Sequence, residues 1–282
     1  MECVSCGNSS FNKFSEKSYL NLPITKCKSC ELMMTGETLE QLDQTLTNYY
    51  KKSSITNEIK NTIEVDHSDN HGKYLKNLWF SHYHYIKPLL KNSKELLEIG
   101  PGTGLALRLF EQEGFNVTGI ETNKNYVKLI NEKLENGECL HGFVEELDIT
   151  KKFDIIWLSH VFEHIIRPDL ILNKCKELLS ENGLIFIAIP DCENPNILNQ
   201  SIHENASSFH YTKDSLVKLV SKSGLTIEKC ESFREFVRIE GRFQMILKNH
   251  FTKLSNMNCP YFPFKRTSGN NGVEIRLILK KT

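Results

Sequence analysis

The sequence predicts an α/β protein with a mostly parallel sheet of the nucleotide-binding type, preceded by a small module that a metal ion holds together. Three observations predict this. Apolar strands and amphipathic helices alternate from about residue 95 onward, and a glycine-rich turn joins the first strand to its helix. Two C-x2-C pairs stand near the amino terminus, and the segment between them has too little apolar surface to fold alone.

The composition limits the classes of protein that fit this chain. Among 282 residues, 35 Lys and Arg balance 35 Asp and Glu, which argues against a nucleic-acid partner. No apolar run approaches the roughly 20 residues that span a bilayer. Cys3 and Cys6 stand where the apolar core of a signal peptide would begin. We therefore expect a cytoplasmic protein with no membrane partner.

Changes in composition predict three segments. Residues 1–36 form the cysteine module, and residues 37–92 form a helical connector and lid. Residues 93–282 form the nucleotide-binding domain. Within that domain we expect an insertion near 232–270, rich in Arg, Phe and Pro, that closes over the substrate.

The expected elements follow in a regular order. Apolar residues at three- and four-residue spacing from His71 to Leu89 predict a helix before the first strand. The continuous apolar run at 153–158 is typical of a strand that is covered on both faces. The expected strands lie at 95–99, 116–121, 139–142, 153–158, 183–190, 226–231 and 273–280, and the expected helices of the domain at 103–113, 123–135, 168–179 and 214–223.

The turn after the first strand indicates which nucleotide binds there. Its glycines are Gly100, Gly102 and Gly104, whereas a dinucleotide fingerprint places the third glycine one residue later. Glu98 precedes the turn, where a carboxylate repels a pyrophosphate but attracts a cationic ligand. Glu121 ends the second strand, where it can accept hydrogen bonds from both ribose hydroxyls. Adenosine with a positive, phosphate-free tail is S-adenosylmethionine (SAM).

With these residues the sequence resembles the class I SAM-dependent methyltransferases, whose first motif is an acid followed by G-x-G-x-G. The resemblance implies a Rossmann-like fold with a mostly parallel, seven-stranded sheet and one antiparallel strand. It also implies an adenine site after the third strand, where Phe143 packs on the base and Glu145 meets its edge. Thr122 and Ser159, at the ends of the second and fourth strands, complete the expected cofactor set.

The four amino-terminal cysteines predict a structural metal site. Cys3, Cys6, Cys27 and Cys30 form two C-x2-C pairs, and four thiolates give a closed tetrahedral Zn²⁺ site with no position for substrate. A redox pair is the rival interpretation, but it lacks a thioredoxin-like context. A zinc ribbon before a methyltransferase core resembles bacterial methyltransferases of sugar-nucleotide and surface-polysaccharide pathways. That group usually has glycine after the second pair, where this chain has Glu31.

The catalytic candidates follow the fourth strand, at the edge where ligands gather in an open α/β sheet. In a helical turn, the i, i+3, i+4 spacing of His160, Glu163 and His164 would place them on one face. Methyl transfer to a hydroxyl releases a proton, and His160 is the leading candidate for the base that accepts it. Glu163 and His164 can equally well brace the adjoining helix.

The resemblance leaves a third interpretation of this cluster open. Some family members bind a divalent ion at an acid-x-x-Glu-His pattern. Here His160 replaces the acid, which weakens a magnesium assignment because Mg²⁺ prefers oxygen ligands. His210 is a further candidate for base or substrate contact, since its segment resembles an aromatic-rich family loop that carries a histidine facing the acceptor.

The leading hypothesis is O-methylation of a sugar nucleotide or related carbohydrate in surface-polysaccharide biosynthesis. C-methylation of a ketosugar is the alternative within the same class. A ribosomal-RNA base methyltransferase would show a basic surface and a histidine-containing knuckle, and the sequence shows neither. A non-catalytic binding protein would have no need of the intact glycine turn and Glu121.

Overall fold

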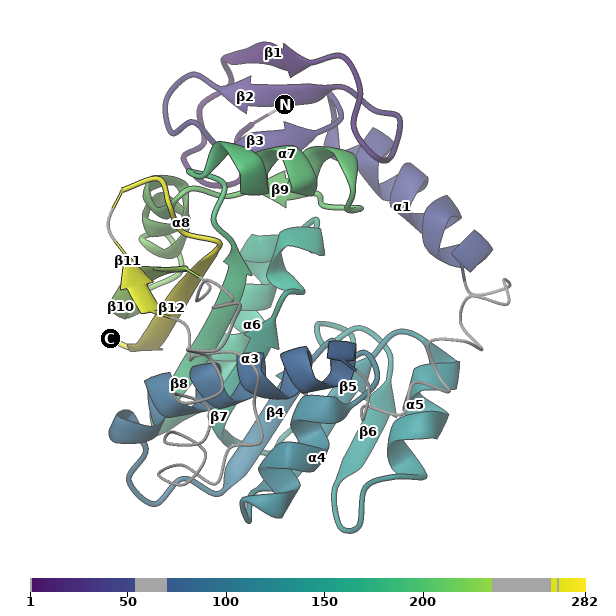
Figure 1. Ribbon diagram of the computed structural model, residues 1–282, viewed down its shortest axis with the longest axis vertical. Helices are drawn as coiled ribbons and strands as arrows, with labels where there is room; N and C mark the ends of the chain where they lie inside the picture. Colours follow the sequence, from purple (N-terminus) through teal and green to yellow (C-terminus); the bar gives the residue numbers. More distant parts are fainter. Residues whose placement is uncertain (1, 54–69, 235–264, 268) are drawn as a thin grey trace, which may run out of the picture.

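The computed structural model describes residues 2–53, 70–234, 265–267 and 269–282. Two sheets organise these residues: a small sheet near the amino terminus and a large sheet flanked by helices (Figure 1). Most of the expected insertion at 232–270 and part of the expected lid lie outside the described residues. None of the described helices is both long and apolar enough to cross a membrane.

The large sheet has the order β11-β10-β12-β8-β7-β4-β5-β6. Its strands are β4 (Glu95–Ile99), β5 (Asn116–Glu121), β6 (Glu138–His141), β7 (Phe153–Ser159), β8 (Leu179–Pro190), β10 (Leu225–Arg234), β11 (Lys265–Thr267) and β12 (Glu274–Lys281). The strands from β6 to β8 pair in parallel, and β12 lies antiparallel between β8 and β10. The predicted fold class is therefore confirmed, with the short edge strand β11 added to the seven expected strands.

Alternation along the central strands creates two apolar clusters, one on each face of the large sheet. Leu96 and Ile155 belong to one cluster, and their neighbours Leu97 and Ile156 belong to the other. This follows from the two-residue period of side chains along a strand. Both faces are buried, as the uninterrupted apolar run of β7 predicts.

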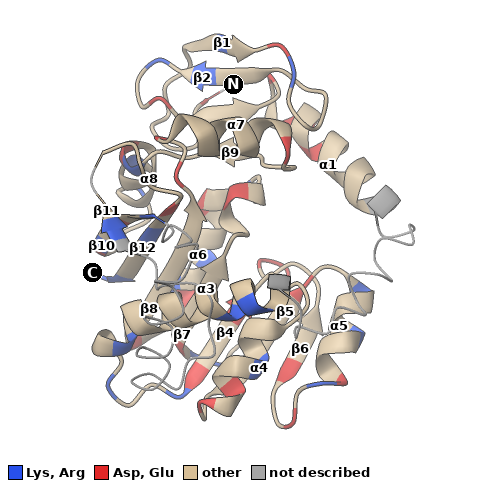
Figure 2. Cartoon of the chain, viewed as in Figure 1, with Lys and Arg blue, Asp and Glu red and all other residues tan. Residues whose placement is uncertain are grey.

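Helices cover these clusters. The helical elements are α1 (Leu39–Ser53), α3 (Asn70–Ile86), η1 (Lys87–Leu89), α4 (Leu105–Gln112), α5 (Lys124–Asn131), η2 (Phe162–His164), α6 (Pro168–Leu178), α7 (Pro195–His203) and α8 (Lys213–Val220). α7 was not predicted from the sequence, although Asn194 caps it and Pro195 stands in its first turn. Figure 2 shows acidic and basic residues mixed along the helices that flank the large sheet.

The small sheet joins distant parts of the chain. It contains β1 (Phe11–Ser15), β2 (Ile24–Cys27), β3 (Met33–Thr35) and β9 (Phe209–His210), in that order and all antiparallel. The fourth strand thus comes from a segment that lies far beyond the expected boundary at residue 36. Figure 1 shows the small sheet stacked over α7, with α1 leading away from it.

Candidate active site at the carboxyl ends of the strands

The glycine turn after β4 is shaped by its missing side chains. Gly100, Gly102 and Gly104 have φ values of 69°, 55° and 74°, which only glycine adopts without strain. A Cβ at Gly100 would lie 2.6 Å from Val161, and one at Gly104 would lie 2.6 Å from Ile130. A Cβ at Gly102 would meet no described atom within 4 Å. The turn is therefore packed at both ends and open in its middle.

Two acidic side chains flank this turn. Glu98 is buried, burial raises its pKa to about 8, and its Oε2 has no hydrogen-bond partner among the described residues. Glu121 Oε2 accepts a hydrogen bond from Gly102 N (3.2 Å), and its Oε1 accepts one from Asn123 N (2.9 Å). A buried carboxyl oxygen without a partner usually marks a missing ligand or water. These residues fit a ligand with a cationic tail and ribose hydroxyls.

The other predicted cofactor residues lie at the same edge of the sheet. Phe143, just after β6, is 54% exposed, whereas its neighbour Val144 is buried. Glu145 is exposed. Thr122 Oγ1 lies 3.3 Å from the carboxylate of Glu121. Ser159, which ends β7, is half-buried, and the binding roles of these residues stay predictions.

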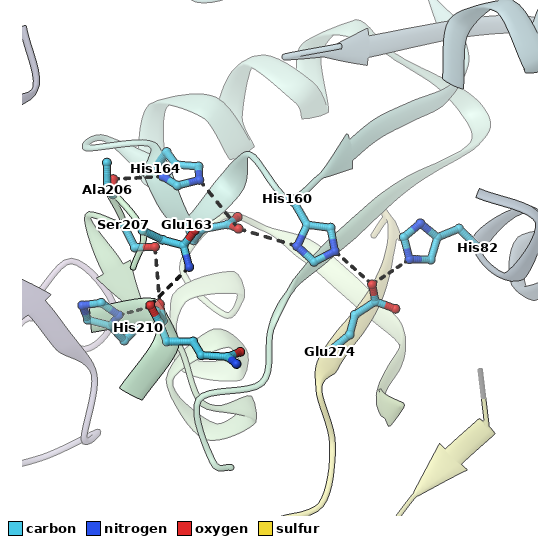
Figure 3. A network of polar contacts seen from close by, with 11 residues as sticks. His82, His160, Glu163, His164, Ala206, Ser207, His210 and Glu274 are labelled. Atoms are coloured by element: carbon cyan, nitrogen blue, oxygen red, sulfur yellow. Dashed lines mark hydrogen bonds and ion pairs between the residues drawn. The ribbon is translucent and has the colours of Figure 1, made fainter. Parts of the chain in front are cut away.

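His160 follows β7 in an unusual backbone conformation. Its φ of 53° lies in the left-handed region that residues other than glycine seldom adopt. Its N–H donates to Ala188 O (2.8 Å), which anchors the turn to β8. The side chain is 38% exposed, with Nε2 3.0 Å from Glu274 Oε2 and Nδ1 3.8 Å from Glu163 Oε1 (Figure 3). Burial alone would lower the pKa of His160, but these two carboxylates raise it to about 10.

Glu274, at the start of β12, is a site residue that the sequence analysis missed. Its side chain is 2% exposed, Oε2 lies 2.8 Å from His82 Nε2, and Oε1 lies 2.5 Å from Arg276 Nε. Burial opposes its ionisation, yet His82, Arg276 and His160 hold the pKa of Glu274 well below its ordinary value. Burial lowers the pKa of His82 to about 4, so this imidazole is neutral and donates through Nε2–H. Glu and Arg within an apolar strand were the available signal, since buried charges need partners.

Glu163 and His164 lie beside His160, but the expected helical turn is shorter: η2 contains only Phe162–His164, and His160 precedes it in the left-handed region. Glu163 is buried in η2, and its Oε1 lies 3.9 Å from His164 Nε2. Glu163 Oε2 has no hydrogen-bond partner among the described residues. Burial opposes ionisation of Glu163, but the two histidines keep its pKa below the usual value. His164 Nδ1 donates to Ala206 O (3.0 Å), which fixes its ring.

His210 lies fully buried in β9. Its Nδ1 is 2.8 Å from Ser201 Oγ, and its Nε2 is 3.3 Å from Thr35 Oγ1. Burial lowers its pKa to about 3, so the ring is neutral. Contact with an acceptor would require one of these hydrogen bonds to break, and the predicted catalytic role of His210 stays a prediction.

A chain of hydrogen bonds connects the small sheet with the catalytic candidates. Thr35 Oγ1 in β3 donates to Ser207 O (2.7 Å), and Thr35 N donates to Ser208 O (3.0 Å). Ser208 in turn donates through N to Glu163 O (2.9 Å) and through Oγ to His164 O (2.8 Å). The small sheet therefore holds the backbone of the turn that carries Glu163 and His164.

The four amino-terminal cysteines lie together, as their spacing predicts. Cys3 Sγ is 3.4 Å from Cys30 Sγ, Cys6 Sγ is 3.6 Å from Cys27 Sγ, and all four sulfurs lie within 4.8 Å of one another. This spacing is compatible with four thiolates around one ion. Glu31 has a φ of 61°, the left-handed conformation that glycine would take more easily at this position.

Comparisons with known proteins agree with this fold. An uncharacterized methyltransferase of Alkaliphilus oremlandii is 35% identical over 94 residues, which cover 33% of this chain and 44% of that protein. A ubiquinone biosynthesis O-methyltransferase of Glaesserella parasuis is 32% identical over 105 residues, which cover 34% of this chain and 44% of that protein. The chain thus spans less than half the length of these two curated relatives.

Solved structures of SAM-dependent methyltransferases share the architecture. One from Archaeoglobus fulgidus has a TM-score of 0.52 at 20% identity, covering 74% of this chain and 94% of that one. One from Clostridium acetobutylicum has a TM-score of 0.52 at 12% identity, covering 83% and 98%. A family model described as "Methyltransferase domain" matches residues 71–229. The chain therefore belongs to the methyltransferase-domain family and has the Rossmann-like fold of the SAM-dependent enzymes.

Proposed function

We propose that this chain transfers the methyl group of SAM to a hydroxyl of a small carbohydrate, with a sugar nucleotide as the leading candidate. The position of His160 is the observation that supports a hydroxyl as the methyl acceptor. Its imidazole is partly exposed, and the next residue, Val161, packs on Gly100 of the glycine turn. This position supports a role for His160 as a base beside the expected donor site, where a hydroxyl must lose its proton.

The residues around the glycine turn would hold SAM as follows. The open middle of the turn at Gly102 and the unpartnered Oε2 of Glu98 would face the cationic tail. Glu121 would accept from the ribose hydroxyls, and exposed Phe143 would pack on adenine. Glu145, Thr122 and Ser159 would complete the pocket. When bound, SAM supplies a methyl carbon from which a neutral thioether leaves in an in-line displacement.

His160 acts as the base for the acceptor hydroxyl in this proposal. The carboxylate of Glu163 lies 3.8 Å from His160 Nδ1 and helps to orient the ring toward the acceptor. The backbone of Glu163 is itself fixed, because Ser208 N donates to Glu163 O. His164 is tied to Ala206 O and supports Glu163 from the other side. The chain's contribution is thus a positioned base and a rigid turn that aligns the acceptor.

A phenolic acceptor is the second candidate. The curated relatives named ubiquinone biosynthesis O-methyltransferases favour it. The carbohydrate candidate is supported by the amino-terminal cysteine module, which the sequence shares with the sugar-nucleotide methyltransferases it resembles. Both acceptors need the same base, so the site geometry alone favours neither.

A panel of acceptors tests the proposal. The purified chain is incubated with SAM and either nucleotide sugars or dihydroxybenzenes, and methyl uptake is followed by mass spectrometry. We expect a methylated nucleotide sugar whose new group is bound to oxygen. Methylation of the phenols alone would replace the carbohydrate with the second candidate, and a carbon-bound methyl would refute O-methylation. Calorimetry that detects no SAM binding would overturn the whole proposal.

We also infer that the cysteine cluster holds a structural Zn²⁺ in a module whose sheet is completed by β9. The support is the mutual approach of four sulfurs and their burial, with Cys3, Cys27 and Cys30 hidden from solvent. Such a site has no open coordination position, so the ion would stabilise the module and would not take part in the reaction.

Replacement of Glu121 by alanine is expected to weaken SAM binding about 10- to 100-fold. The reason is the loss of charge-assisted hydrogen bonds, each of which contributes about 1.5–3 kcal/mol. Calorimetry with the variant and with the wild type measures the difference. Glu138→Ala, which removes an exposed acid from the neighbouring strand β6, serves as the matched control. Equal SAM affinity in wild type and Glu121→Ala would refute the assignment.

A further inference from the structure

Two charged residues occupy the otherwise apolar strand β12. Glu274 and Arg276 are 2% and 1% exposed, and Glu274 pairs in register with Pro190 at the carboxyl end of β8. This places Glu274 next to the end of β7 and therefore next to His160. Removing a charge from water costs several kcal/mol unless partners compensate for it. The groups that stabilise the buried charge of Glu274 therefore indicate its role.

The two oxygens of Glu274 have separate partners. Oε1 forms an ion pair with the guanidinium of Arg276. This guanidinium also donates to Ser81 O (3.0 Å) and lies over the ring of Phe233, 4.0 Å from its centroid. Arg276 is thus fixed from three sides. Oε2 is left to the imidazoles of His82 and His160.

His82 fixes the second oxygen in place. It projects from α3, and its ring centroid lies 5.0 Å from that of Phe186 and 5.7 Å from that of Trp157. Because this ring is enclosed and neutral, its Nε2–H gives Glu274 Oε2 a constant hydrogen bond of 2.8 Å. Arg276 and His82 therefore fix the carboxylate of Glu274 independently of His160. Within the cluster of His82, His160 and Glu274, only His160 is partly exposed.

The two nitrogens of His160 consequently have different tasks. Nε2 is bound to Glu274 at 3.0 Å, whereas Nδ1 is 3.8 Å from Glu163, too far for a hydrogen bond. We propose that Glu274 is a positioning residue for methyl transfer: it holds His160 as the Nε2–H tautomer and so directs Nδ1 to the acceptor hydroxyl. This inference rests on the proposed function. The same logic governs the buried carboxylate of a Ser-His-Asp triad.

Proton transfer to His160 accompanies methyl transfer to the acceptor oxygen in this proposal. The acceptor proton passes to Nδ1, the acceptor oxygen uses the released electron pair to bond the methyl carbon, and the electron pair of the carbon–sulfur bond stays on sulfur. The positive charge that forms on His160 is stabilised by Glu274 through Nε2–H. The charged and titratable groups that face His160 are His82 on α3, Glu163 and His164 on η2, and Glu274 and Arg276 on β12.

A divalent cation is the competing interpretation of this cluster. Donor atoms of His82, His160 and Glu274 lie within 4.8 Å of one another. However, the guanidinium of Arg276 is bound to the same carboxylate and would repel a cation there. The geometry therefore favours hydrogen bonds over metal coordination.

The test replaces Glu274 by glutamine and follows the His160 imidazole by NMR in the 282-residue chain without acceptor. We expect the pKa of His160 to fall by about one unit or more, because a negative partner is lost. We also expect kcat to fall at least about tenfold at constant SAM affinity, with the acid limb of the kcat/KM profile moved to lower pH. Glu231→Gln is the matched control: this carboxylate on β10 binds Tyr85 and Arg266 and should leave His160 unchanged.

A measurement on the wild type keeps the test independent of the variant's folding. Nitrogen chemical shifts at alkaline pH should show neutral His160 protonated at Nε2, and protonation at Nδ1 would overturn the proposal. An unchanged His160 pKa in folded Glu274→Gln would also overturn it, as would Zn²⁺-dependent broadening of the His82 and His160 signals. If the tautomer and the shift appear but no hydroxyl acceptor is methylated, the proposed function fails while the pairing of Glu274 with His160 stands.

Discussion

Substitution of His160 by glutamine is expected to lower turnover by about 10²- to 10⁴-fold, the range typical of a lost general base. Glutamine keeps a polar side chain of similar reach but cannot accept and hold a proton near neutral pH. The SAM affinity should stay within about twofold, because the glycine turn and Glu121 are untouched. Acceptor-saturated kinetics and calorimetry measure the two quantities separately. His84→Gln, which changes an exposed histidine on α3, is the control.

The pH dependence gives this prediction a second test. With a pKa of about 10, His160 in the free protein is mostly protonated between pH 7 and 9, and only the neutral form can take a proton. The value of kcat/KM for a hydroxyl acceptor should therefore rise through this interval, close to tenfold per pH unit. A flat profile over the same interval, or wild-type turnover in His160→Gln, would remove His160 as the base.

Removal of the metal from the cysteine cluster is expected to unfold the amino-terminal module before the core and to lower turnover at least about tenfold. Structural Zn²⁺ contributes about 10–16 kcal/mol to the folding of comparable small sites. The effect should reach the active site because Thr35 holds Ser207 and Ser208, and Ser208 holds Glu163 and His164. Metal analysis, hydrogen exchange of the amides at 209–210 and kinetics after chelation measure the three consequences.

The double variant Cys27→Ser, Cys30→Ser should reproduce the effect of chelation. Cys230→Ser, which changes a half-buried cysteine on β10, should have little effect and controls for thiol loss. A purified protein that contains no metal and yet has a folded amino-terminal module would contradict the zinc assignment. Normal turnover with the module unfolded would contradict the link through Ser208.

The central fold was predictable because its signals are local. The apolar run of β7, the glycine turn at 100–104 and the capped helix α8 each appear within a short stretch of sequence. β9 has two residues and β11 has three, and each forms only because a partner strand offers a free edge. Such pairing depends on tertiary context and has no periodicity from which it could be predicted.

The candidate site also contains residues that the local sequence predicts and residues that only the tertiary fold brings together. His160, Glu163 and His164 could be predicted because five consecutive positions contain all three. Glu274 lies 114 residues from His160, and the two meet only because β12 inserts between β8 and β10. His82 falls on the apolar face that the helical spacing predicts, but the sequence did not reveal that it is buried to hold a carboxylate.

The origin of β9 has a consequence for how the protein matures on the ribosome. Thr35 and its partner Ser207 are separated by 172 residues, so β3 is made long before the strand that completes its sheet. At about 5–20 residues per second, its edge stays unpaired for roughly 10–30 s. An open edge invites pairing with other chains. Early capture of an ion by the four cysteines would hold the nascent module in its native shape during this interval.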